Sequence, residues 1–338
     1  MKFYTSVLPY RGRLLVRGVD KDGTQKKYRI NYKPSLFVPV KKETKYKTLD
    51  GRYVEKIKFD SMPEATKWVN EYKHVTNFEY FGNTRHQYPF IAEEFEGKID
   101  WDMNQIKLLS IDIECESENG FPSPEKADQP LICITVKDHT SKKIIVFGMG
   151  NFVNDREDVQ YIDCVTETGL VETFTKFWVE YNPDIITGWN VKFFDIPYLM
   201  NRFRYLMGDD WLNQFSPWGV VEQRSAAVLF ASREQQVWNI MGVDTLDYLD
   251  LYRKFTFVRR ESYKLDYIGE VELGQNKLEN PYDTFKEFYQ NDYQRFVEYN
   301  IQDVELVDKL EDKLQLIALH LTMAYEAKVN YQDVFGQV

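Results

Sequence analysis

The sequence predicts an α/β domain preceded by a small α+β domain. The first 60 residues contain 16 Lys and Arg against 6 Asp and Glu, whereas the other 278 residues contain 27 against 47. Short strands fill the basic part, and longer apolar strands alternate with helices from about residue 105, which is typical of α/β domains. A chain of 338 residues is also long enough for two domains. We therefore predict domains at residues 1–104 and 105–318.

The first domain, residues 1–104, is predicted from strand and helix signals. Apolar side chains alternate over residues 3–7, and a β-branched and aromatic run follows at 36–40. Ser61 and Glu64 have capping-box spacing, and a buried helical stripe follows them at Ala65, Trp68, Val69 and Tyr72. The lysines and arginines of this domain form either a nucleic-acid surface or a solvated basic face. Its interleaved tyrosines and phenylalanines either stack on bases or belong to the core.

The second domain begins with apolar strands. Strands are predicted at 106–115, 131–137, 143–149 and 183–188, and helices at 170–181 and 195–207. Two runs, 220–230 and 235–243, flank a polar turn and indicate a β-hairpin insertion. Apolar residues recurring every three or four positions from Ile301 to Leu321 predict one long amphipathic helix. Residues 319–338 form a C-terminal segment that we expect to pack on the first domain.

Composition excludes several classes of protein. The three cysteines, Cys115, Cys133 and Cys164, lack the spacing of a disulfide framework or a zinc site. The first ten residues lack the apolar core of a signal peptide, and no run approaches the length of a membrane span. We therefore expect a soluble intracellular protein in a reducing compartment, with no membrane partner.

Two carboxylates interrupt the first apolar strand of the second domain. Because side chains alternate along a strand, Asp112 and Glu114 point to the same side of the sheet. Two adjacent buried carboxylates repel each other unless a cation balances them, and oxygen ligands favour Mg²⁺ or Mn²⁺ over zinc. The alternative is that the strand ends near Asp112 and both groups are solvated.

Two further positions are candidates for the same site. Asp195 follows a predicted strand end, where ligands usually bind in open α/β sheets, although an Asp shortly before a Pro is also typical of a helix N-cap. Tyr299 and Asp303 are four residues apart on one face of a predicted helix. That spacing alone carries no weight, because a chain this rich in Tyr and Asp contains it by chance.

The ordered combination of these motifs is informative. Asp-x-Glu at 112–114, Asn-x-x-x-Phe-Asp at 190–195 and Tyr-x-x-x-Asp at 299–303 resemble the three motifs of the 3′→5′ proofreading exonucleases. Longer runs at 187–198, 246–255 and 262–268, and Tyr32-Lys-Pro-Ser-Leu-Phe37, resemble the family B replicative DNA polymerases of T-even-like phages. This resemblance spans nearly the whole chain and implies a ribonuclease H-like exonuclease domain with a mixed sheet.

The resemblance also implies roles for individual residues. Asp112 would bridge two Mg²⁺ (or Mn²⁺) ions, Glu114 and Asp303 would complete the first ion's site, and Asp195 would support the second. Tyr299 would orient the attacking water, and Lys277 would lie near that water, against the alternative that it is an exposed lysine. Glu298 stands where the related histidine subtype has its histidine, so the tyrosine subtype fits better.

Residues that contact DNA follow from the same resemblance. Phe121 would stack on the terminal base, unless it only packs under a turn. Asn190 would hydrogen-bond the scissile nucleotide, unless it only caps its own turn. Phe194 would also contact DNA. The hairpin at 220–243 would help separate primer from template, with Arg224 and Arg233 contacting phosphates.

The family's palm motif, its fingers lysine motif and its Asp-Thr-Asp are absent from this sequence. We therefore expect no nucleotide polymerisation by this chain alone, and either a shortened polymerase or one product of a split polymerase gene. The implied partners are a single-stranded DNA 3′ end, primer-template DNA and the remaining polymerase domains, in the cytoplasm of a phage-infected bacterium. The alternatives are a non-catalytic nucleic-acid-binding or regulatory module and a metal-dependent nuclease acting on RNA.

Overall fold

The computed structural model describes residues 1–117, 122–227 and 234–336. The chain divides into two compact units, one formed by Met1–Trp101 with Met323–Val338 and the other by Asp102–Thr322. Within the described ranges, no helix combines the length and the apolar composition that a membrane span requires.

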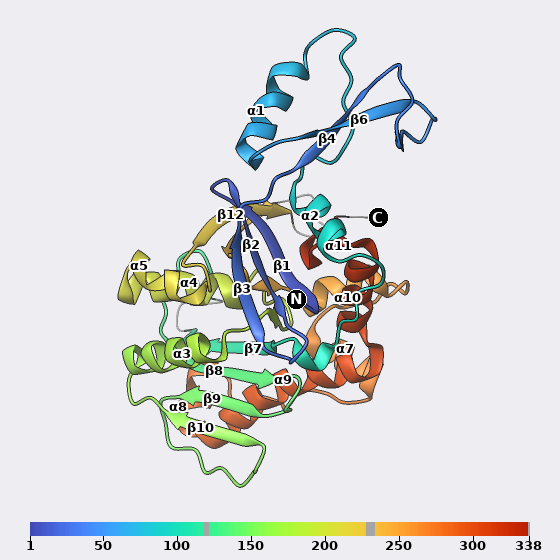
Figure 1. Cartoon of the computed structure of the whole chain (residues 1–338). Helices are drawn as coiled ribbons and strands as arrows, with labels where there is room; N and C mark the ends of the chain where they lie inside the picture. Colours follow the sequence, from blue (N-terminus) through green and yellow to red (C-terminus); the bar gives the residue numbers. More distant parts are fainter. Residues whose placement is uncertain (118–121, 228–233, 337–338) are drawn as a thin grey trace. The chain divides into compact units, whose positions relative to one another are not determined.

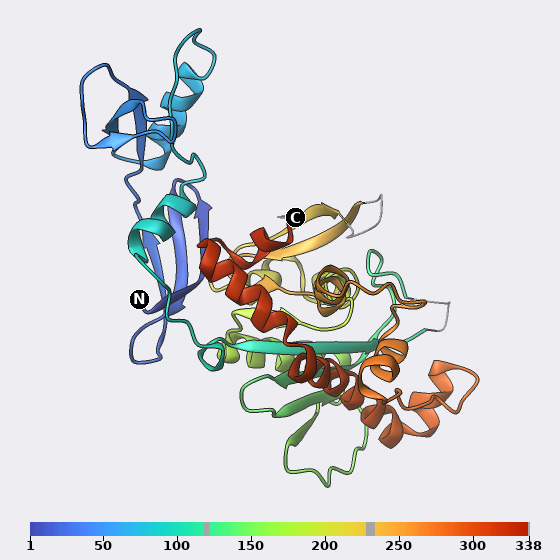
Figure 2. The same ribbon diagram turned by 90° about the vertical axis from the view of Figure 1, so that its right-hand side faces the viewer.

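The first unit contains two antiparallel three-stranded sheets (Figure 2). One consists of β1 (Phe3–Tyr10), β2 (Arg13–Val19) and β3 (Gln25–Ile30), in that order. In the other, β6 (Tyr53–Lys58) lies between β4 (Ser35–Pro39) and β5 (Tyr46–Lys47). The helices of this unit include α1 (Met62–Tyr72), α2 (Gln87–Glu94) and α11 (Tyr331–Phe335). The predicted α+β composition is therefore confirmed.

Helix α1 begins where the sequence predicts. The Ser61 hydroxyl accepts a hydrogen bond from the backbone N–H of Glu64 at 3.3 Å. The Glu64 carboxylate accepts from the N–H of Asp60 at 2.7 Å, one residue before the N-cap. The first half of the predicted capping box is therefore present, and the returning bond is displaced by one residue.

The C-terminal segment completes the first unit. The side-chain amide of Asn330 pairs with both backbone groups of Val7, accepting from its N–H at 2.8 Å and donating to its carbonyl at 2.9 Å. Tyr325 donates to the carbonyl of Tyr4 at 2.7 Å, and Tyr4 donates to that of Val329 at 2.7 Å. These bonds satisfy backbone groups of Val7 and Tyr4 on β1 and the carbonyl of Val329.

A six-stranded mixed sheet forms the centre of the second unit (Figure 1). Its order is β10 (Val159–Asp163), β9 (Ile144–Gly148), β8 (Leu131–Asp138), β7 (Leu108–Cys115), β11 (Ile185–Thr187) and β14 (Asp244–Thr245). The central pairs β7–β8 and β8–β9 are antiparallel, and the outer pairs are parallel. Four of these strands are the ones predicted from the sequence.

Helices cover both faces of this sheet. On one face, α3 (Glu167–Tyr181) and α4 (Asp195–Met207) pack against the odd-numbered side chains of β7 in a core that includes Ile111, Phe174 and Phe203. On the other face, α8 (Phe285–Asn291) and α9 (Tyr293–Leu314) pack in a core that includes Val146, Phe288 and Ile301. The remaining elements are η1 (Met103–Gln105), α5 (Asp209–Leu212), η2 (Asn213–Phe215), α6 (Tyr248–Phe255) and α7 (Leu265–Leu273). The predicted α/β layering is confirmed.

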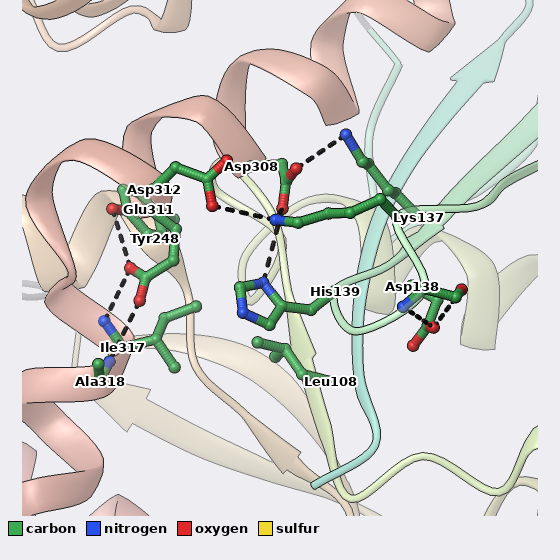
Figure 3. Close-up of polar contacts among 12 residues, drawn as sticks. Leu108, Lys137, Asp138, His139, Tyr248, Asp308, Glu311, Asp312, Ile317 and Ala318 are labelled. Atoms are coloured by element: carbon green, nitrogen blue, oxygen red, sulfur yellow. Dashed lines mark hydrogen bonds and ion pairs between the residues drawn. The ribbon is translucent and has the colours of Figure 1, made fainter. Parts of the chain in front are cut away.

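The prediction of one long C-terminal helix is wrong. The helix breaks at Gln315, which has a left-handed backbone (φ 52°, ψ 38°), and α10 (Leu316–Ala327) begins at the next residue. Figure 3 shows how the break is stabilised: the Glu311 carboxylate accepts from the N–H groups of Ile317 at 3.0 Å and Ala318 at 3.2 Å. The apolar period continues across the break, so periodicity could not reveal it.

The predicted hairpin is confirmed in its stem. Strands β12 (Val221–Ala227) and β13 (Glu234–Ile240) pair antiparallel in a two-stranded sheet, with Val221 opposite Ile240. The tip of the hairpin lies outside the described residues.

Candidate active site

Strand β7 brings two acidic side chains to the helix α9 face of the sheet. Because Ile111 and Ile113 enter the core beneath α3 and α4, Asp112 and Glu114 project to the opposite face. Both side chains are half-buried, so the strand continues through them and does not end at Asp112. The predicted alternation of this strand is confirmed.

Helix α9 supplies a third carboxylate. One oxygen each of Asp112, Glu114 and Asp303 lies within 4.8 Å of the other two. Asp303 is 3% exposed, because it lies on the stripe of α9 that faces the sheet. Tyr299, one helical turn earlier, is half-buried against Phe288. The structure therefore brings together the residues of the first and third sequence motifs.

A lysine from the segment after α7 reaches this carboxylate group. The Lys277 ammonium donates to Asp303, lies 3.3 Å from the Tyr299 hydroxyl and sits 4.9 Å from the centre of the Tyr299 ring. Its backbone N–H donates to Asp266 at 2.8 Å, which fixes the segment to α7. Lys277 is therefore not simply an exposed lysine, because its side chain is only 22% exposed and forms an ion pair with Asp303.

Asp195 is held at the start of α4. Its carboxylate accepts from the backbone N–H of Ile113 on β7 at 3.1 Å, and the helix N-cap is Phe194, which makes no side-chain capping bond. The N-cap alternative for Asp195 is therefore wrong. Asp195 is not among the three carboxylates whose oxygens lie within 4.8 Å of one another. Its charge nevertheless raises the pKa of both Asp112 and Glu114.

A second buried aspartate shapes the turn that leads to Asp195. Asp247, 1% exposed, accepts from the N–H groups of Asn190 at 3.1 Å and Lys192 at 3.0 Å. Gly188 begins this turn, and a side chain there would meet the carbonyl oxygen of Ile111 at 2.5 Å. Asn190 is left-handed (φ 65°), a conformation that Asn tolerates better than most residues. Together these residues set the position of α4.

Burial and mutual repulsion raise the pKa values of the carboxylates. Burial, followed by the charge of Asp303, raises the pKa of Asp112 well above its usual range and that of Glu114 to about 8. Burial also raises the pKa of Asp195 to about 7, although the bond from Ile113 opposes this shift. For Asp303, burial outweighs the nearby Lys277 ammonium, and its pKa is also raised.

The side chains present fit a divalent cation. Asp303 Oδ1 is buried without a hydrogen-bond partner among the described residues, and its neighbours are carboxylate oxygens whose charges repel one another. Burial lowers the pKa of Lys277, but the charges of Asp303, Tyr299 and Asp112 outweigh this effect and raise it, so the lysine stays charged. Bare oxygen ligands of this kind suit Mg²⁺ or Mn²⁺.

Part of this site, including Asp112, Glu114 and Asp195, lies in a region that matches a known family. The family model described as "DNA polymerase family B, exonuclease domain" matches residues 66–268. The chain belongs to DNA polymerase family B. The match covers β7, α4 and Asp247, so the predicted family is confirmed.

Relatives within family B extend the match to the whole chain. The DNA-directed DNA polymerase of Escherichia phage RB69 is 31% identical over 100% of this chain, and that of Enterobacteria phage T4 is 29% identical over 100%. The DNA polymerase delta catalytic subunit of Caenorhabditis elegans is 29% identical over 65% of the chain. The chain spans 40% of the length of each phage polymerase and 21% of the delta subunit.

The residues predicted to contact DNA lie at different places in this family B structure. Asn190 and Phe194 border the turn before α4, and the half-buried Phe194 packs beside Tyr198 with ring centres 5.9 Å apart. Arg224 is exposed on β12. Phe121 and Arg233 lie outside the described residues.

Two uncharged residues of the site were not predicted from the sequence. Asn300, 0% exposed on α9, donates to the Asp112 carboxylate at 3.3 Å. Thr135, 0% exposed, is the direct cross-strand partner of Asp112 on β8 and donates to the Asn300 side-chain oxygen. The only sequence signal of either residue is that a polar side chain stands where an apolar one is expected. Thr135 interrupts the apolar strand predicted at 131–137, and Asn300 follows Tyr299 at the start of the predicted helix.

Proposed function

We propose that this chain is a metal-dependent 3′→5′ exodeoxyribonuclease, the proofreading part of a family B DNA polymerase. The observation that carries this proposal is the convergence of Asp112, Glu114 and Asp303, with a buried Asp303 oxygen that lacks a hydrogen-bond donor among the described residues. In this proposal the exonuclease domain is residues 105–318, residues 1–104 form the N-terminal domain, and residues 319–338 form a C-terminal segment.

Hydrolysis of a phosphodiester needs an activated water and stabilisation of the charge that develops on the phosphate. Two Mg²⁺ or Mn²⁺ ions would supply both when bound. Asp112 would contact both ions, Glu114 and Asp303 would hold the first, and Asp195 would support the second.

The remaining residues act on the water and the substrate. The Tyr299 hydroxyl would orient the attacking water, since burial raises the pKa of this phenol to about 12 and it stays protonated. Lys277 would hold Tyr299 and Asp303 in place through its contacts with both. Asn190, Phe194 and Arg224 would contact a single-stranded or frayed 3′ end, as would Phe121 and Arg233.

The proposal extends to the biological setting. The chain would not polymerise nucleotides alone, and it would act on primer-template DNA together with the remaining polymerase domains, in cis or as a separate chain. The setting would be the cytoplasm of a phage-infected bacterium.

Degradation of a 5′-labelled single-stranded DNA tests this proposal. We expect products that shorten from the 3′ end with Mg²⁺, and none with EDTA or in Asp112→Asn combined with Glu114→Gln. Glu298→Gln, an exposed change on α9, the helix that carries Asp303, is the matched control and should remain active. RNA of the same sequence should be cleaved more slowly, and faster cleavage of RNA would make the chain a ribonuclease. A folded chain that cleaves nothing with Mg²⁺ or Mn²⁺ would instead be a non-catalytic module.

A further inference from the structure

Asn300 occupies an unusual position beside the carboxylates. It is 0% exposed, although a primary amide is costly to bury unless its groups are hydrogen-bonded. It lies between Tyr299 and Asp303 in sequence, on the part of α9 that packs on β7 and β8. Ile301 and Val304, which lie near it on the same helix, are buried in an apolar core, so an apolar residue would fit at this position. The amide therefore needs an explanation other than packing.

Its hydrogen bonds have a defined direction. The hydroxyl of Thr135 donates to Asn300 Oδ1, and Asn300 Nδ2 donates to Asp112 Oδ2 at 3.3 Å. An ionised carboxylate only accepts hydrogen bonds, so the amide must present its NH₂ group to Asp112 and its oxygen to Thr135. The carboxylate thus decides which end of the amide faces it, and the hydrogen bond from Thr135 holds the amide in that orientation beside Asp112.

The sheet register makes this arrangement possible. Thr135 and Asp112 are directly opposite each other on the antiparallel strands β8 and β7, so their side chains lie on the same face. Helix α9 crosses that face and places Asn300 above the pair. A bond to Oδ2 leaves Asp112 Oδ1 available to another ligand. Asn300 also hydrogen-bonds the Glu114 carboxylate, where it opposes the increase in pKa caused by burial.

We propose that Asn300, oriented by Thr135, is a positioning residue that presents the Asp112 carboxylate to the divalent cation. This inference rests on the proposed function. Groups that hydrogen-bond a ligating carboxylate fix its orientation, and losing one typically lowers metal affinity or activity by about 10- to 100-fold.

Direct measurement of Mn²⁺ binding to the full chain, by titration calorimetry and by the spin resonance of free Mn²⁺, tests this role without a turnover assay. We expect Asn300→Ala to weaken binding by about 10- to 100-fold and Thr135→Val to weaken it less. Thr135→Ser, which keeps the hydroxyl, should restore binding. Combining Asn300→Ala with Thr135→Val should be no worse than Asn300→Ala alone, because Thr135 acts through Asn300.

Ile301→Val is the matched control, because it removes buried volume from the same helix without touching a carboxylate. It should lower the melting temperature and leave Mn²⁺ affinity unchanged. Wild-type affinity in Asn300→Ala and Thr135→Val, or additive effects in the double variant, would overturn the positioning role alone. If Asn300→Ala does not fold, Thr135→Val and Thr135→Ser still decide the question. A wild-type chain that binds no Mn²⁺ would overturn both the proposed function and this role.

Discussion

Removing a carboxylate from the candidate site should stabilise the metal-free protein. In unfolded protein Asp195 ionises above its usual pKa of 3.8, whereas in the folded protein its pKa is about 7. The folded state therefore binds the proton more tightly, and stability falls as the pH rises between these two values. One pKa unit corresponds to about 1.4 kcal/mol, so ionised Asp195 costs at most about 4 kcal/mol above pH 7.

The assay is urea unfolding of the wild type and Asp195→Asn in EDTA. We expect the variant to be more stable, by about 2 kcal/mol near pH 5.5 and by up to about 4 kcal/mol near pH 8.5. Asn keeps an oxygen that can accept from Ile113, so the observed bond is retained. Saturating Mg²⁺ should reverse the order by stabilising the wild type more than the variant.

Asp308→Asn provides the matched control with the opposite sign. The Asp308 carboxylate is buried and lies 2.8 Å from the Lys137 ammonium (Figure 3). The Lys142 ammonium also lies 2.8 Å from it. Burial raises the pKa of this group, but the bonds from His139, Lys137 and Lys142 outweigh it and hold the pKa below its usual range. Its charge therefore stabilises the fold above the unfolded pKa, and the substitution should cost about 3 kcal/mol near neutral pH. Destabilisation by Asp195→Asn in EDTA, or a gain that does not change with pH, would refute this account of the site.

Three further outcomes are expected. Tyr299→Phe should lower the rate of 3′-end hydrolysis by about 100-fold with little change in Mn²⁺ affinity, because it removes only the hydroxyl; an unchanged rate would contradict the role of that group. Lys277→Met should move the acidic limb of the pH–rate profile to higher pH, because the cation now opposes the upward shift of the Asp303 pKa; a limb that stays in place would argue against this coupling. Gln315→Gly should raise the free energy of unfolding by about 1 kcal/mol, because glycine adopts the left-handed conformation without strain; a loss of stability in the urea assay would show that the Gln315 side chain contributes more than its backbone costs.

The carboxylates of the site could be predicted from the sequence, whereas the residues that hydrogen-bond and position them could not. The two-residue period of β7 places Asp112 and Glu114 on one face, because strand geometry allows no other arrangement. Their roles and those of Asp195, Tyr299 and Asp303 stay predictions. Local sequence patterns do not report long-range hydrogen bonds, such as those of Asn300 or Asp247, since each depends on the register of a strand distant in the chain.

The prediction of one continuous C-terminal helix was wrong for a related reason. Leu310, Leu314, Ile317 and Leu321 keep their helical spacing on both sides of the break. A hydrophobic period reports which residues face the core, and it contains no information about one residue with a left-handed backbone. The carboxylate of Glu311 that caps the new helix has the same sequence appearance as any exposed glutamate.

The pairing of Asn330 with Val7 has a consequence for the order of events during synthesis. Val7 is synthesised more than 300 positions before Asn330, its hydrogen-bond partner in the same unit. The second unit, by contrast, is continuous from Asp102 to Thr322 and can fold as soon as it has emerged. The Val7 backbone groups of β1 therefore stay hydrogen-bonded to water while the second unit forms.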